Sequence, residues 1–272
     1  MDKRCIIIIP VYKTLPTFAE IESLKQALTV LSAHNFCLIC AKNFDTTAYD
    51  HVIKDFKNVS VSIKRLNPAY FSSIDGYNQL MLSLKFYRSF NEFLFMLIYQ
   101  LDAWVFSDDL LAWCNKDYDY IGAPWYEKKD KQLIFAGVGN GGFSLRKIRS
   151  HIKVLTSFSY VIKPGYFAYL LKRRFSLQHI LFTLRGLLMS NNTFYLLNDF
   201  QENEDRFWGL IATRNFKWFK VPSEKEAKKF AIEVYPSKFI TSKVDLPFGC
   251  HAWEKYEPEF WQRFIKVSDI NL

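Results

Sequence analysis

Residues 93–102 read Phe-Leu-Phe-Met-Leu-Ile-Tyr-Gln-Leu-Asp, the most apolar run of the chain followed at once by polar side chains. The seven residues Phe93–Tyr99 predict a central strand, because a strand that is covered on both faces lacks polar alternation. This strand delivers Gln100 and Asp102 at its carboxyl end, which is where α/β sheets usually bind ligands. The stretch therefore predicts both the middle of a sheet and the edge of a site.

The N-terminal part of the chain alternates predicted strands and helices. Cys5–Tyr12 is a continuous apolar run that predicts a second covered strand, and Phe36–Cys40 predicts a third. Between them, Thr17 and Glu20 form the T-x-x-E pattern of a capping box at a helix start. Val59, Val61 and Ile63 alternate with polar residues, as in a strand near a sheet edge. Strands alternating with helices indicate a largely parallel α/β sheet.

Further elements follow on either side of the central strand. Asp75 is expected to cap a helix, and Ser107 a shorter helix that runs through Trp113. Tyr118–Pro124 predicts a strand and a turn. Gly137–Gly142 then holds four glycines in six residues, and such clustering indicates special backbone angles or close approach of a ligand to the main chain.

Composition limits the class of protein. The 272 residues are 50% hydrophobic, which excludes a disordered chain, and this length predicts one large domain or two small ones. Neither a secretory signal nor an apolar run of membrane-spanning length is found, so a cytoplasmic protein is expected. The formal charge of +9 predicts attraction to anions. Cys37 and Cys40 have C-x-x-C spacing but lie in an apolar run, which favours buried reduced thiols.

Residues 156–198 differ in composition from the rest and predict a helical insertion. They are rich in Phe, Leu and Tyr, carry basic residues at 172–174, and contain no Asp or Glu. Two interpretations stay open. The insertion rests on an anionic membrane surface, where apolar and basic side chains cooperate, or it is a basic helical pair packed on the core.

Four motifs occur along the chain in a fixed order: Gln100-Leu101-Asp102, Gly137–Gly142, Asn203-Glu204-Asp205 and His251. This order resembles the GT-A class of nucleotide-sugar glycosyltransferases, which carry a D-x-D motif, a glycine-rich loop, an x-E-D motif and a C-terminal histidine. The segments YQLDAWVF, DYIGAPW, VGNGGFSLR and FGCHAW more closely resemble a bacterial branch linked to surface-polysaccharide synthesis. The resemblance covers about residues 5–150 and 199–253. It implies one catalytic domain over residues 1–272, built on a Rossmann-like mixed, mostly parallel sheet flanked by helices, with residues 156–198 as an insertion.

The resemblance also implies an activity. A sugar would move from a nucleoside diphosphate sugar, with UDP-sugar expected, to an acceptor hydroxyl in capsule or lipopolysaccharide synthesis. Asp205 would be the base of an inverting reaction, and Glu204 would orient the acceptor or the sugar. Asp102 and His251 would hold a divalent cation, Mn²⁺ or Mg²⁺. Gln100 replaces the first Asp of the D-x-D motif and carries no charge, which leaves metal dependence open.

Two sets of binding residues complete the expectation. Those expected at the nucleotide-sugar are Pro10, Val11, Tyr12, Tyr77, Lys85, Gln100, Asp102, Gly141 and Gly142. Those expected at a glycan or lipid-linked glycan acceptor are Trp125, Asn140 and Trp208. For Tyr12, stacking on a base and core packing are equally open. Lys85 or Arg88 would face the diphosphate, with a solvated surface position as the alternative for Lys85.

Rival functions come from other classes. A sugar nucleotidyltransferase shares a similar sheet, but the segment after Ile9 has only Lys13 and lacks the early glycine-rich phosphate loop. A carbohydrate-binding protein without catalysis could use the same aromatic residues. No helix-turn-helix, zinc-finger or RNA-binding signature appears, so nucleic acid is not an expected partner.

Overall fold

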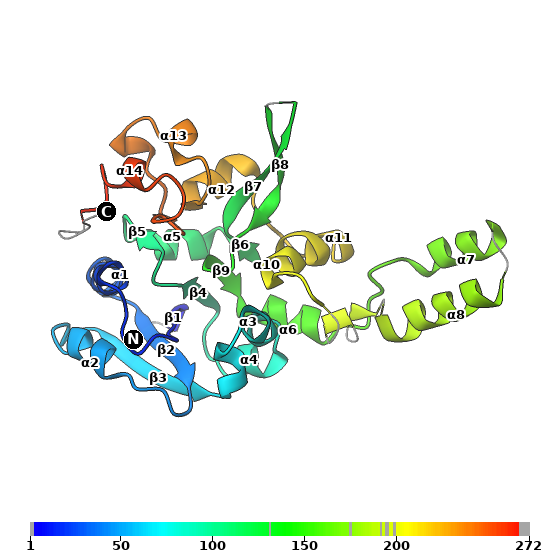
Figure 1. Cartoon of the computed structure of the whole chain (residues 1–272), viewed down its shortest axis with the longest axis horizontal. Coiled ribbons are helices and arrows are strands. Elements are labelled where there is room, and N and C mark those ends of the chain that lie inside the picture. Colours follow the sequence, from blue (N-terminus) through cyan, green and yellow to red (C-terminus); the bar gives the residue numbers. More distant parts are fainter. Residues whose placement is uncertain are drawn as a thin grey trace.

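The centre of the molecule is a six-stranded sheet with the order β3-β2-β1-β4-β9-β6 (Figure 1). The computed structural model describes residues 3–130, 132–173, 176–190, 192–193, 196–197 and 200–266. The strands β3, β2, β1 and β4 run parallel, and β9 is antiparallel to both of its neighbours. This confirms the predicted mixed, mostly parallel sheet. The strands are β1 (Cys5–Pro10), β2 (Asn35–Ala41), β3 (Ser60–Leu66), β4 (Phe95–Tyr99), β6 (Tyr120–Ile121) and β9 (Phe143–Lys147).

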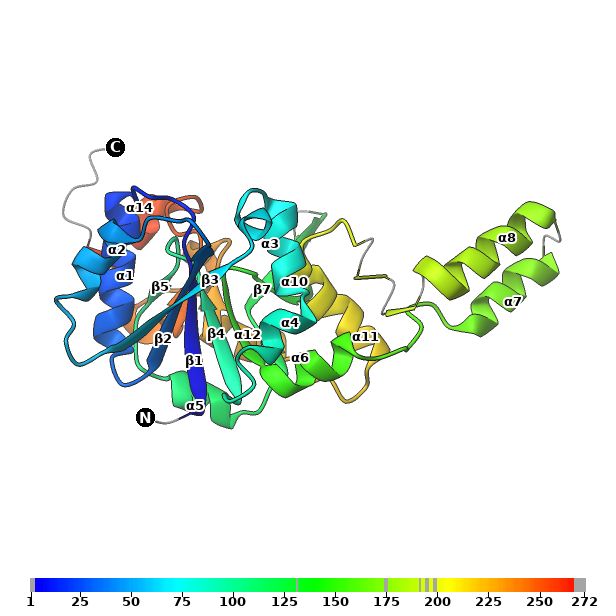
Figure 2. The ribbon, with the colours of Figure 1, turned by 90° about the horizontal axis from the view of Figure 1, so that it is seen from below.

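Helices cover both faces of this sheet (Figure 2). Side chains alternate along β1, so Ile7 and Ile9 join a core under α1 and α2, whereas Ile6 and Ile8 join a second core under α3, α4 and α6. Both faces are therefore apolar, which explains the unbroken hydrophobic run of β1. The helices are α1 (Phe18–Val30), α2 (Thr47–Ile53), α3 (Ile74–Met81), α4 (Leu84–Arg88), α5 (Leu110–Asn115) and α6 (Ile148–Leu155).

Two smaller sheets extend the central one. An antiparallel hairpin joins β7 (Ala123–Lys129) to β8 (Gln132–Gly139), and a second small sheet has the order β10-β11-β5. Its strands are β5 (Trp104–Val105), β10 (Ala231–Ile232) and β11 (Gly249–Cys250). The remaining elements are short: η1 (Pro68–Phe71), α10 (Glu204–Arg206), η3 (Phe207–Ala212), α11 (Thr213–Asn215), α12 (Glu224–Phe230), α13 (Pro236–Phe239), η4 (Lys243–Asp245) and α14 (Pro258–Trp261).

Hydrogen bonds at the helix starts confirm one predicted cap and correct two. Thr17 and Glu20 form the reciprocal capping box expected for α1. Asp75 does not cap its helix, because the hydroxyl of Ser73 accepts from the backbone N–H of Gly76 and α3 begins at Ile74. Ser107 does not cap α5 either; its hydroxyl donates to the carboxylate of Asp109, and the helix begins at Leu110.

The segment 156–198 forms two helices that project away from the body of the molecule (Figures 1 and 2). They are α7 (Pro164–Arg173) and α8 (Leu177–Arg185), and η2 (Gly186–Ser190) continues α8. Arg174 of the predicted basic cluster and Asn198 at the end of the segment lie outside the described residues. Within the described part of the chain, no helix is long and apolar enough to cross a membrane.

All five cysteines are buried free thiols, as predicted for Cys37 and Cys40. Both lie in β2, which β1 and β3 flank; Cys40 joins the core on one face of the sheet and Cys37 the core on the other.

His151 on α6 makes the stability of the fold depend on pH. It is fully buried, its Nδ1 donates to the carbonyl of Lys147 at 2.9 Å, and its Nε2 has no partner. Burial, assisted by the charge of Arg146, lowers the pKa of His151 well below 6.5. In acid, His151 therefore binds a proton in the unfolded chain but not in the folded chain. As the pH falls below 6.5, we expect the free energy of unfolding to drop by up to about 1.4 kcal/mol per pH unit.

Urea unfolding of the wild type and of His151→Phe, each at about pH 7.5 and about pH 5.5, measures the contribution of His151 to the pH dependence of stability. The wild type should lose more stability on acidification than the variant. His51→Phe on the exposed surface of α2 is the matched control and should keep the wild-type difference. An equal loss in wild type and His151→Phe would contradict the assignment.

Candidate active site

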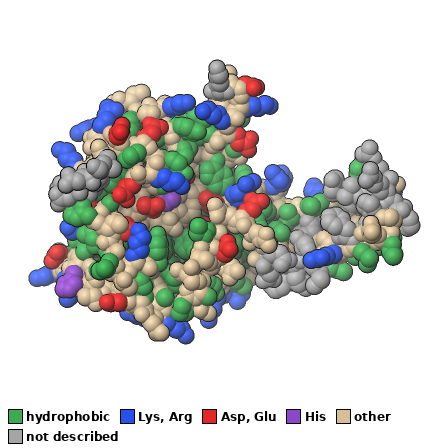
Figure 3. Space-filling model, viewed as in Figure 1, with side chains coloured by type: hydrophobic (Ala, Val, Ile, Leu, Met, Phe, Trp, Pro, Cys, Tyr) green, Lys and Arg blue, Asp and Glu red, His purple; other side chains and the backbone are tan. Residues whose placement is uncertain are grey.

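A cavity of about 610 Å³ opens at the carboxyl ends of β1 and β4. Because β9 is antiparallel to β4, with Phe143 opposite Tyr99, the glycine loop before β9 reaches the same edge. Figure 3 shows acidic side chains gathered around the hollow on this face. Its walls come from seven segments of the chain, and the lining residues include Tyr12, Tyr77, Asn78, Gln100, Asn140, Gly141, Gly142, Glu204, Asp205, Glu233, His251 and Lys255.

One end of the cavity is organised around the imidazole of His251. Its Nε2 lies 3.1 Å from Oδ1 of Asp102 and 3.4 Å from Oε1 of Gln100, and its Nδ1 lies 3.3 Å from Oε1 of Glu233. Burial opposes the imidazolium, but the hydrogen bonds and charges of Asp102 and Glu233 raise the pKa of His251 to about 10. For Asp102, burial opposes ionisation, and the hydrogen bond and charge of His251 bring its pKa below the ordinary value.

A short antiparallel ladder positions this pair. Cys250 in β11 pairs with Trp104 in β5, so His251, the residue directly after β11, falls beside the turn that carries Asp102. In addition, the N–H of Gln100 donates to the carbonyl of Gly142 at 2.7 Å, which fixes the glycine loop to the end of β4. Three segments distant in sequence thus meet at one point.

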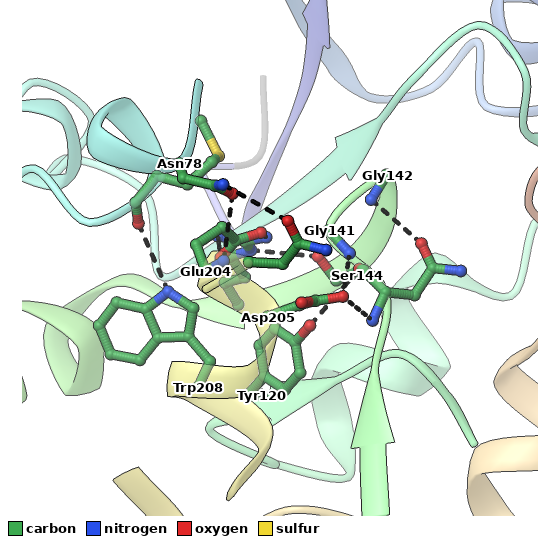
Figure 4. A network of polar contacts seen from close by, with 12 residues as sticks. Asn78, Tyr120, Gly141, Gly142, Ser144, Glu204, Asp205 and Trp208 are labelled. Carbon is green, nitrogen blue, oxygen red and sulfur yellow. Dashed lines mark hydrogen bonds and ion pairs between the residues drawn. The ribbon is translucent and has the colours of Figure 1, made fainter. Parts of the chain in front are cut away.

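A second group of lining residues surrounds Asp205, at the start of α10. Its Oδ2 accepts hydrogen bonds from the backbone N–H groups of Asn140 (3.1 Å) and Gly141 (3.2 Å), as Figure 4 shows. Its Oδ1 is buried and has no partner. Burial raises the pKa of Asp205, while the N–H of Asn140 opposes the shift. One oxygen is therefore fixed by the glycine loop and the other is available as an acceptor.

Glu204 beside it is bound in an ion pair inside the protein. Nη1 and Nη2 of Arg146 donate to its two carboxylate oxygens at 3.0 and 2.8 Å, and both side chains are almost completely buried. Burial raises the pKa of Glu204, and the guanidinium of Arg146 opposes this. Both oxygens are paired with Arg146, so the ion pair fixes the start of α10. The expected role of Glu204 in orienting the acceptor or the sugar stays a prediction.

Asn140 in the glycine loop holds an unusual backbone conformation, with φ of 105°. Its Oδ1 accepts from the backbone N–H groups of Gly142 and Phe143, both at 3.0 Å, which compensates for the strain. Its Nδ2 is buried without a partner, and so is the hydroxyl of Tyr77. Together with Oδ1 of Asp205, residues of this one cavity therefore supply two unpartnered donors and one unpartnered acceptor.

Comparison with protein families identifies the chain. The model of the family described as "Protein of unknown function (DUF5672)" matches residues 60–251, which is more than half of the sequence. The chain belongs to this family. No curated protein matches the sequence of this DUF5672 member.

Solved structures show which fold the DUF5672 member shares. Core-mannan synthase A from Aspergillus fumigatus, in a Mn/GDP form, is similar with a TM-score of 0.50 at 8% identity, covering 80% of this chain and 72% of that one. Mouse xyloside xylosyltransferase 1 is similar with a TM-score of 0.46 at 8% identity, covering 91% and 96%. An active-site mutant of LgtC gives 0.44 at 12% identity, covering 90% and 86%. The likeness to the mannan synthase confirms the expected GT-A type of fold.

Several residues predicted for the DUF5672 site do line its cavity. They are Tyr12, which is 56% exposed, together with Tyr77, Gln100, Asn140, Gly141, Gly142, Asp205 and His251. Asp102 lies directly beside His251. Pro10 and Val11 are buried at the end of β1, and only the following Tyr12 reaches the cavity.

Three predicted residues do not line the cavity. Lys85 is exposed on α4, and its side chain does not line the cavity. Trp208 is fully buried in the core, and its Nε1 donates to the carbonyl of Met81 at 3.4 Å. Trp125 packs beneath Gly139 and Gly209, where an added Cβ would meet its indole ring or the neighbouring backbone. Trp208 therefore presents no face to a sugar, whereas Trp125 is partly buried and lies outside the lining of the cavity.

Sequence reasoning missed four residues of the site. Glu233 follows β10 and holds the imidazole, and Lys255 provides a cation four positions after His251. Asn78 on α3 accepts from the N–H of Glu204 through Oδ1 at 3.1 Å. Arg146 forms the ion pair. Of these, only Lys255 has a usable signal in the sequence, its closeness to a histidine already singled out.

Gly142 is expected to tolerate no side chain. An added Cβ would overlap Nε2 of His251 and Oε1 of Gln100. We expect Gly142→Ala to weaken binding of Mn²⁺ with a nucleoside diphosphate by about tenfold or more, because either the imidazole or the loop must move. A thermal-shift titration with Mn²⁺ and a nucleoside diphosphate measures this affinity. Gly165→Ala, where a Cβ meets no atom within 4 Å, is the control, and unchanged binding by Gly142→Ala would contradict the geometry.

Proposed function

We propose that the chain is a glycosyltransferase that moves a sugar from a nucleoside diphosphate sugar, with UDP-sugar as the first candidate, to an acceptor hydroxyl. One observation carries this proposal. His251, which is paired with Asp102, and Asp205 come from segments far apart in the sequence and line one cavity, whose residues also carry buried polar atoms without a partner. A polyhydroxylated ligand supplies the hydrogen bonds that these buried atoms lack.

The donor diphosphate would lie at the end of the cavity that holds His251. Among the described residues, no three His, Cys, Asp or Glu side chains are arranged as a metal site. Oδ1 of Asp102, Nε2 of His251 and Oε1 of Gln100 nevertheless converge. Once Nε2 has given up its proton, this donor set would suit Mn²⁺ or Mg²⁺ completed by phosphate oxygens. Glu233 on Nδ1 would orient the ring toward the ion. The cation would neutralise charge on the departing diphosphate.

Lys255 takes the role first expected of Lys85. It lines the cavity near His251, whereas Lys85 does not, so its ammonium is placed to approach the phosphates of a donor. Tyr12, exposed at the rim of the same cavity, is the candidate for stacking on the nucleotide base.

Asp205 is the proposed base. Its Oδ2 is fixed by two backbone N–H groups, and its raised pKa increases the basicity of the free Oδ1 toward an acceptor hydroxyl. Nδ2 of Asn140 and the hydroxyl of Tyr77 would hold sugar hydroxyls. A single base opposite the leaving group suits inversion at the anomeric carbon.

The finer setting of the proposal rests on the sequence resemblance. We place the reaction in the synthesis of bacterial surface glycan, capsule or lipopolysaccharide, on the cytoplasmic side of the membrane. The acceptor would then be a glycan or a lipid-linked glycan.

A panel of sugar nucleotides tests the proposal, with and without Mn²⁺. Without an acceptor, slow release of nucleoside diphosphate from one donor is expected, and NMR of a transferred product should show an inverted anomeric configuration. Retained configuration would overturn the role of Asp205 as sole base. Binding of sugars without any donor hydrolysis would instead make the chain a carbohydrate-binding protein.

A further inference from the structure

The projecting helix α8 turns an apolar stripe outward. Leu177, Leu181, Leu184 and Leu188 recur at spacings of four, three and four, which place them on one side of a helix. They are 74%, 59%, 48% and 61% exposed. Thr183, on the other side of α8, is 5% exposed. The polarity of α8 is therefore the reverse of that of a helix packed on a core, because Thr183 is buried and the four leucines are exposed.

The stripe is continuous along the helix. It runs through α8 into η2, for roughly 16 Å at the rise of an α-helix. Single exposed leucines are ordinary on protein surfaces, but a contiguous row marks a surface that another body covers. Figure 2 shows that α7 and α8 stand clear of the central sheet, so the body of the protein does not cover them.

The charge of the segment 156–198, which carries α7 and α8, indicates the kind of partner. Residues 156–198 contain five Lys or Arg and no Asp or Glu. Lys163, Lys172 and Arg185 are exposed, and Arg185 follows Leu184 directly, at the border of the stripe. A second copy would bring a like charge against this one, which disfavours self-association. Apolar and basic side chains together match the boundary of an anionic bilayer.

We propose that the face of α8 formed by Leu177, Leu181, Leu184 and Leu188 docks on an anionic lipid surface. The leucines enter the headgroup region, and Lys172 and Arg185 face the lipid phosphates. The helix lies on the bilayer and does not span it, in keeping with the absence of a spanning helix among the described residues. This inference does not depend on the proposed transferase activity.

Vesicle flotation of the full chain tests the docking surface. Vesicles with roughly one third anionic lipid should capture the wild type, neutral vesicles should not, and about 0.5 M salt should weaken capture. Leu181→Ser combined with Leu184→Ser should lower partitioning about tenfold or more, since each leucine loses its apolar contact with the bilayer. Leu15→Ser with Val244→Ser, at sites 84% and 93% exposed elsewhere, is the matched control and should float like the wild type.

A charge-reversal variant tests the basic side chains independently of the leucines. Lys172→Glu with Arg185→Glu keeps the leucines and should also lower capture, while the melting temperature and any donor-induced thermal shift stay as in the wild type. Capture that is equal on neutral and anionic vesicles, or unchanged in the double leucine variant, overturns the proposal. So does a dimer in solution that the leucine substitutions dissolve, because the partner would then be a second copy.

Discussion

Asp205→Asn is expected to lower the rate of sugar transfer by about 10²–10⁴, the range that a general base contributes. The amide oxygen of Asn can still accept from the N–H groups of Asn140 and Gly141, so the loop is kept. The amide nitrogen then replaces the free Oδ1, and it cannot take the proton of an acceptor hydroxyl. Donor binding should remain, because the Asp102–His251 pair is untouched. Product formation and donor titration, measured side by side, separate the two effects.

The control for this variant is Asp75→Asn. Asp75 is an exposed carboxylate in the first turn of α3, the helix that carries Tyr77 and Asn78 into the cavity. It should transfer sugar at close to the wild-type rate. Near-normal turnover by Asp205→Asn would exclude the base role. Loss of donor binding together with turnover would show that the carboxylate holds the loop and is not a base.

Arg146→Met is expected to destabilise the fold by about 3–5 kcal/mol, because it leaves the carboxylate of Glu204 buried without a counter-charge. The pair is sealed inside the protein: Arg146 is 0% and Glu204 1% exposed. At roughly 2–4 °C per kcal/mol for a chain of this size, the melting temperature should fall by about 10 °C. Differential scanning calorimetry measures the change.

A double-mutant cycle identifies the cause. Arg146→Met combined with Glu204→Gln removes the stranded charge and should recover a large part of the lost stability. Arg206→Met breaks the exposed pair between Arg206 and Glu202 and should change stability by less than about 1 kcal/mol. If Arg146→Met were as mild as Arg206→Met, the buried pair would not be holding α10 in place.

The sequence predicts the parallel part of the sheet well because its signal is local. β1, β2 and β4 are continuous apolar runs covered on both faces, and β3 alternates as an edge strand does. The capping box of α1 also lies within four residues. Such patterns follow from burial and from backbone hydrogen bonding within one segment, so no knowledge of distant contacts is needed.

The site is less predictable because its contacts join distant segments. Arg146 and Glu204 are 58 positions apart, and Gln100 and His251 are 151 apart. Trp208 directly follows the carboxylate motif, and its sequence neighbourhood fits a sugar-stacking role as well as a core role. Only the packing of Tyr87 and His151 against its ring shows that it is core. The polarity of a segment predicts that a site exists but not which side chains reach it.

The ladder between β5 and β11 is only two residues long on each side, yet the imidazole depends on it. A slip of one position would turn every side chain of β11 to the opposite face of the strand. His251 would then point away from Asp102, although the rest of the molecule could fold unchanged. Insertions within residues 104–105 or 249–250 should therefore abolish activity without unfolding the protein. Lengthening of loops outside these residues should leave activity in place. Loop grafts onto this fold should therefore preserve the pairing between β5 and β11.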